Sequence, residues 1–172
     1  MELIIRNKWI SLAGSSYVRD MNENDVYQVK GKFWTFTKKK FIKDLDDNLL
    51  YMVRNKFWTL FVKKAFVYDP KGEIVAKIRR KFFSLHDHYD VESKYGKITL
   101  RGNIIGFDYH ISLNDVEIGH ISRKVSLRDS FILSINDEVD IPFFVALVIA
   151  IDNITDESNQ EAAAASSASF NS

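Results

Sequence analysis

The chain has 172 residues, and its 46% hydrophobic and 13% aromatic content is typical of a folded domain and not of a disordered chain. Its 24 basic and 23 acidic side chains leave a formal charge of +1, so binding to an anionic partner would have to come from a local cluster of charges. The sequence has no cysteine, which excludes disulfides, thiolate metal sites and cysteine nucleophiles.

The N-terminal segment, MELIIRNKWISLAG, has no basic region followed by an apolar run, so it is not typical of a secretory signal. The longest apolar run, residues 141–151, is interrupted by Pro142. A helix that crosses a membrane needs about 20 apolar residues. We therefore expect a cytoplasmic protein without a transmembrane segment.

Similar phrases recur along the chain, in the order RNKWIS, KGKFWT, RNKFWT and RRKFFS. Their lysines are Lys8, Lys32, Lys56 and Lys81, at spacings of 24, 24 and 25 residues. Two weaker copies, RGNIIG and SRKVSL, follow. Self-similarity at a fixed period indicates one repeated supersecondary unit.

Each copy contains a turn signal about halfway between successive lysine phrases, flanked by two short runs rich in β-branched and aromatic residues. Two strands in each of six copies predict twelve strands in an antiparallel meander. The position just before the lysine is Asn or Gly in four of the six copies, which predicts a recurring bulge or bend there. The predicted turns are Asn22-Glu23-Asn24, Asp46-Asp47-Asn48, Asp69-Pro70-Lys71-Gly72, Lys94-Tyr95-Gly96, Asn114-Asp115 and Asn136-Asp137.

The last copy ends differently, because a helix is predicted from about Pro142 to Ile154 where another strand would fall. Asp140 can cap such a helix, and proline suits a first helical turn. A helix that is apolar on every side must be buried on every side. The prediction is a mainly β fold: a twelve-stranded antiparallel closed barrel, built from six two-strand repeats around a central hydrophobic C-terminal helix. It forms one domain over residues 1–154, and residues 155–172 form a disordered low-complexity tail.

The phrases IRNKWISL, KGKFWT, RNKFWT and RRKFFSL and the closing IPFFVALVIAIDNI resemble the bacterial branch of the LURP-one-related family, over about residues 2–154. The resemblance implies the tubby C-terminal-like fold, a twelve-stranded barrel around a hydrophobic C-terminal helix, which the phospholipid scramblases share. It also implies phosphoinositide binding, lipid scrambling or signalling, without assigning residues. The chain carries neither the cysteine-rich palmitoylation segment nor the terminal membrane span of scramblases, so we do not expect scrambling.

Enzyme chemistry and cofactors are not predicted. The segment His86-Asp87-His88, with His110 or Asp108 as a third group, has the residue types of a metal site. The same segment is also a polar strand start, as at the equivalent positions of other repeats, so we expect no metal. The sequence contains no G-x-S-x-G elbow, P-loop or G-x-G-x-x-G motif, and we expect no catalytic residues.

Nucleic acid is not an expected partner either. A lysine is followed by two aromatic residues at Lys32-Phe33-Trp34 and Lys56-Phe57-Trp58, and surfaces that stack bases combine the same residue types. These aromatics recur with the repeat, however, which favours a place in the core. The near-zero net charge also argues against binding to nucleic acid.

A local basic cluster remains as the candidate site. Lys39 and Lys63 occupy the same repeat position, as do Lys40 and Lys64, and Lys38 precedes them. If successive repeats are neighbours, these five lysines meet at one rim of the barrel. The functional interpretation is peripheral binding of anionic phospholipid or phosphate headgroups. The lysines are equally consistent with solubilising turns, and the domain with a protein–protein interaction or regulatory scaffold that has no lipid ligand.

Overall fold

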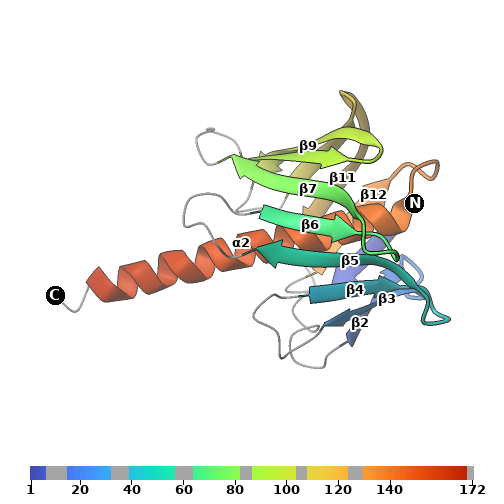
Figure 1. Ribbon diagram of the computed structural model, residues 1–172, viewed down its shortest axis with the longest axis horizontal. Helices are drawn as coiled ribbons and strands as arrows, with labels where there is room; N and C mark the ends of the chain where they lie inside the picture. The colour runs from blue at the N-terminus through green and yellow to red at the C-terminus, as the bar shows by residue number, and fades with distance from the viewer. Residues whose placement is uncertain are drawn as a thin grey trace.

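The computed structural model describes residues 1–6, 15–31, 39–56, 64–81, 87–103, 108–123 and 130–169, and in these ranges it contains twelve strands and one helix (Figure 1). The strands are β1 (Glu2–Arg6), β2 (Ser15–Asp20), β3 (Asp25–Gly31), β4 (Lys39–Lys43), β5 (Leu49–Lys56), β6 (Lys64–Tyr68), β7 (Ile74–Lys81), β8 (Asp87–Ser93), β9 (Gly96–Asn103), β10 (Asp108–Leu113), β11 (Val116–Arg123) and β12 (Ser130–Ile135). The helix is α2 (Ile141–Ser169).

The strands form a closed antiparallel barrel in which each strand pairs with its neighbours in sequence. The barrel is closed by the pairing of β1 with β12, in which Ile4 lies opposite Ile132. The predicted meander of twelve strands is therefore confirmed, and the ring has no open sheet edge among the strands described.

Tight turns gather at one end of the barrel, here called the turn end. Residues with positive φ lie in five of the six predicted turns: Glu23, Asp47, Gly72, Gly96, Asn114 and Asp115. Three of the turns are also held by an aspartate at or just before their start, since the carboxylates of Asp20, Asp44 and Asp69 accept the backbone N–H of Asn24, Asn48 and Glu73. Glycine, asparagine and aspartate tolerate a positive φ, and the aspartate carboxylates supply the hydrogen bonds to the turn backbone. These residue types therefore predict the turns from the sequence.

The bulges are not where the repeat predicted them. Register shifts occur at Val18/Arg19, Ile42/Lys43, Val67/Tyr68 and Ile111/Ser112, near the turn end. At Gly102, in the column before the lysine, β9 and β10 pair without a shift. A Cβ on Gly102 would lie 1.8 Å from the backbone oxygen of Asp108, so glycine there permits a close approach of two strands.

The first part of α2 fills the barrel. Residues 143–151 are all at most 1% exposed, so every side of this segment is covered. The strands contribute alternate residues to the same core, among them Val18, Val29, Ile42, Val53, Val67 and Ile78. Twelve strands enclose more space than their own side chains fill, and an apolar helix occupies it.

Both ends of the buried segment are fixed by polar contacts. At the turn end Asp140 caps the helix, because its Oδ1 accepts the Phe143 N–H at 3.1 Å. The same carboxylate accepts the hydroxyl of Tyr51 at 2.5 Å and that of Tyr95. At the opposite end, Thr155 shares a hydrogen bond of 3.0 Å with the buried Tyr89 hydroxyl. The helix therefore runs through the barrel from one end to the other.

The helix is longer than predicted. It continues to Ser169, whereas the sequence predicts that it ends at about Ile154 and is followed by a disordered tail. Gln160, Glu161 and four successive alanines have high helix propensity, and they extend a helix that the barrel has already nucleated. This distal part projects from the barrel (Figure 1). Among the described residues, the length and apolarity needed to cross a membrane are not combined in any helix.

Candidate functional site

The structure places three of the five predicted lysines at one end of the barrel. Lys39 and Lys40 begin β4 and Lys64 begins β6, at the end opposite the turns, here called the lysine end. Only β5 separates the two strands. Lys38 and Lys63 lie outside the described residues.

The strand register separates these three lysines by face. Lys40 lies opposite Val53, which is fully buried, so the Cβ of Lys40 is on the inner face of the barrel. The side chain of Lys40 is half-buried. Lys39 is opposite Arg54 on the outer face, and the exposed Lys64 is opposite Arg79 on the same face. The outer surface therefore carries two of the predicted lysines, Lys39 and Lys64, and also two arginines, Arg54 and Arg79, that were not among the predicted site residues.

The four neighbouring strands β4 to β7 contain no aspartate or glutamate. They carry three cationic residues in β4, two in β5, one in β6 and four in β7, ten in all. The strands on either side do contain acids, with Asp25 in β3 and Asp87, Asp90 and Glu92 in β8. A chain with a net charge of +1 thus concentrates positive charge on one sector of its barrel.

Apolar side chains alternate with these cations on the outer face. One cross-strand row holds Phe41, Met52 and Tyr68, which are all half-exposed. The next row towards the lysine end holds Lys39, Arg54, Phe66 and Lys77. Directly opposite side chains on one face lie about 5 Å apart. We call this surface, made by Lys39, Phe41, Met52, Arg54, Lys64, Phe66, Tyr68, Lys77 and Arg79, the basic face.

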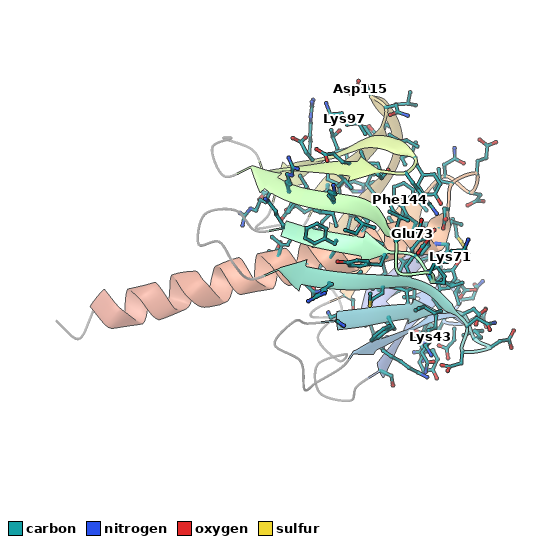
Figure 2. The ribbon with its side chains drawn as sticks, in the orientation of Figure 1. Lys43, Lys71, Glu73, Lys97, Asp115 and Phe144 are labelled. Atoms are coloured by element: carbon teal, nitrogen blue, oxygen red, sulfur yellow. The ribbon has the colours of Figure 1, made fainter. Side chains whose placement is uncertain are left out.

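Acidic partners meet the basic face at its margins. Arg79 pairs with Glu92 at 3.6 Å, on the β8 side. At the turn end, Lys30 and Lys43 contact Asp47 at 2.5 and 2.9 Å, and their hydrogen bonds lower the pKa of that carboxyl to about 2 (Lys43 in Figure 2). Among the described residues, Lys39 and Lys64 have no ion-pair partner; the side chain of Lys39 is half-buried and that of Lys64 is exposed.

A family model described as LURP-one-related matches residues 1–152, which is most of the chain. The chain belongs to the LURP-one-related family. Comparison with curated proteins and with solved structures gave no match.

This LURP-one-related barrel also carries a group of metal-ligand residue types, different from the one considered in the sequence. His86 lies outside the described residues, and His88 on β8 is separated from His110 on β10 by β9. His110 is instead directly opposite His120 on β11, and Asp108 approaches both.

A bulge makes this histidine pair unpredictable from the sequence. Near the Asn114-Asp115 turn, Leu113 pairs with Val116, and continuing that register would place Gly119 opposite His110. The shift between Ile111 and Ser112 moves His120 into that place. Nothing in the sequence of this hairpin marks the position of the bulge.

Proposed function

We propose that this domain is a binding module that attaches peripherally to anionic phospholipid or phosphate headgroups through the basic face. The observation that carries the proposal is that strands β4 to β7 hold ten cationic residues and no carboxylate, in a chain of almost balanced charge; the carboxylates of this sector lie in its turns, at the end away from Lys39 and Lys64. Such a sector attracts anions although the molecule as a whole is nearly neutral.

The composition of the basic face suits a bilayer surface. Each lysine or arginine near an anionic membrane contributes about 1 kcal/mol, so a handful of cations gives reversible attachment. The aromatic rings of Phe41, Phe66 and Tyr68 stand among the cations, and aromatic side chains favour the boundary between headgroups and acyl chains. Lysine also tolerates varied phosphate positions, because its ammonium group is a compact charge on a flexible stem.

The proposal includes the finer family assignment. We infer that the chain belongs to the bacterial branch and has the tubby C-terminal-like fold, on the strength of the lysine phrases and the buried C-terminal helix. The role is binding in the cytoplasm without catalysis, and without scrambling of lipids. Phosphoinositide binding, which the resemblance implies, would use the same attraction between cationic side chains and phosphate headgroups.

Vesicle co-sedimentation tests the proposal with a charge-matched control. The test variant is Lys39→Glu/Lys64→Glu, and the control is Lys71→Glu/Lys97→Glu, which makes the same change in net charge away from the basic face (Figure 2). The vesicles are phosphatidylcholine alone or mixed with phosphatidylserine. We expect wild type and control to bind only the anionic vesicles, and the test variant to bind about 30-fold more weakly or worse, from two lysines at about 1 kcal/mol each.

Salt and competition complete the experiment. Binding should be lost at 1 M salt, where charges are screened beyond about 3 Å. Competition by soluble inositol phosphates would indicate a headgroup site, and its absence would indicate attraction to the charged surface. Equal binding by test variant and control would refute the basic face. A pull-down from the source cell that survives high salt, with no vesicle binding, would favour the protein-interaction role.

A further inference from the structure

The hairpin of β10 and β11 carries two histidines side by side on its outer face. His110 and His120 are cross-strand partners, and their ring centroids are 4.9 Å apart. One ligand atom from each of Asp108, His110 and His120 lies within 4.8 Å of the other two. Three ligands of this kind are a common set for a transition metal.

The bulge also recruits a fourth polar side chain. Glu117 and His120 are three residues apart, so a regular strand would place them on opposite faces. The shift at Ile111/Ser112 leaves Ile118 unpaired, and Ile118 packs against the core. As a result Glu117 shares the outer face with both histidines and lies 3.1 Å from Nδ1 of His110.

Each imidazole is held by one carboxylate. Nε2 of His120 is 2.6 Å from Oδ1 of Asp108, and Nδ1 of His110 is bonded to Glu117. The second nitrogen of each ring is not used in these bonds. A carboxylate in the position of Glu117 fixes the ring orientation of a histidine ligand and raises its basicity, whereas Asp108 lies close enough to His120 to share a metal ion with it.

We propose that Asp108, His110 and His120 bind one divalent transition-metal ion of the zinc class, with Glu117 as a positioning residue for His110. This is a site separate from the basic face, on the far side of β8 and β9. In a tetrahedral zinc site, neighbouring ligand atoms lie roughly 3.4 Å apart, given metal–ligand bonds of about 2.1 Å. The side chains need only small rotations to reach this spacing, and His110 and Asp108 are free to make them at 60% and 57% exposure.

The donor set selects the metal. Imidazole nitrogen suits zinc, copper and nickel, whereas calcium and magnesium prefer sites made entirely of oxygen. Two carboxylates balance the charge of a divalent cation, and solvent is available for the fourth position. Because the ligand side chains are exposed to solvent, a metal ion can both enter and leave the site, and we expect reversible binding.

Equilibrium dialysis of the tag-free full chain against zinc chloride, followed by elemental analysis, tests the site. We expect one zinc per chain, and no retention of calcium under the same conditions. His110→Ala and His120→Ala should each lose at least 10-fold in zinc affinity, and Glu117→Gln should lose about 10-fold. His88→Ala on β8 is the matched control and should bind as wild type does.

A spectroscopic readout keeps the test independent of variant folding. In wild-type protein, zinc should shift the imidazole NMR resonances of His110 and His120. The alanine variants should keep the thermal melting curve of apo wild type, because both histidines lie outside the core. Failure to retain zinc at saturating metal, resonances of these two rings that do not move, or equal affinities of His120→Ala and His88→Ala would each overturn the proposal.

Discussion

At the scale of single residues, Asp140 joins the helix to the wall of the barrel. Its carboxylate caps α2 and accepts the hydroxyls of Tyr51 and Tyr95. Lys94 completes the group, with its ammonium 3.0 Å from the Tyr51 hydroxyl and 4.8 Å from the centre of the Tyr95 ring. The sequence predicted the cap because capping is local. It could not predict the tyrosines, which only the closed barrel brings to Asp140.

This group makes the protein sensitive to alkali. Burial, the hydrogen bond to Asp140 and the contact with Tyr95 raise the pKa of Tyr51 well above its ordinary value. Above about pH 10 the unfolded chain loses a proton that folded Tyr51 retains, so the free energy of unfolding falls as pH rises, by up to about 1.4 kcal/mol per pH unit. The stability from this group is fully present below pH 10.

Tyr51→Phe should separate the two effects of the hydroxyl. At pH 7 we expect a loss of about 1 to 3 kcal/mol in urea unfolding, since the hydroxyl donates to a charged acceptor. Between pH 10 and 11, the variant should lose stability with pH more slowly than wild type. Some slope should remain, because burial and Asp140 also raise the pKa of Tyr27. Parallel curves for the two proteins would contradict this account.

At the scale of elements, α2 divides into a buried part and a projecting part. The buried part reaches at least Thr155, which is 5% exposed. A fully buried leucine or phenylalanine contributes about 2 kcal/mol or more, so a helix with thirteen successive buried residues, 143–155, is a major part of the core. The projecting part stands away from the strands (Figure 1).

Two truncations should therefore behave differently. Removal of residues 140–172 leaves an unfilled apolar lumen, and we expect an insoluble product. Removal of residues 160–172 keeps the buried part, and we expect a soluble protein whose free energy of unfolding changes by less than about 1 kcal/mol. Solubility and urea unfolding measure both. A soluble and cooperatively unfolding product of the longer deletion would mean that the helix is peripheral.

The elements also show which sequence signals carry structural information. The turns, the strand count and the start of α2 were predictable, since each depends on a few adjacent residues with defined backbone preferences. The bulges and the inner position of Lys40 were not, because they depend on register between strands. The sequence does not mark the end of α2, because its alanine-rich stretch has the low complexity of a disordered tail although alanine has the highest helix propensity.

At the scale of the whole molecule, charge is distributed unevenly around the barrel. Ion exchange detects such asymmetry, since a protein binds a charged resin through its most favourable face. We expect wild type to be retained by a cation exchanger at pH 7.5 more strongly than its net charge of +1 suggests. Lys39→Glu/Lys64→Glu should elute at clearly lower salt than Lys71→Glu/Lys97→Glu, although both variants have the same net charge. Co-elution would show that the sector β4 to β7 does not dominate the surface potential.

The position of α2 also dictates the order of assembly. The helix begins beside Tyr51 at the turn end and reaches Tyr89 at the lysine end, with a long extension beyond. A segment of this length does not readily thread a closed ring, so we infer that the sheet wraps around the helix and that the pairing of β1 with β12 completes the barrel. In that order β1, which is synthesised before β12, pairs with it only once the helix is in place, and we expect a chain that ends before residue 141 to remain an open and aggregation-prone sheet.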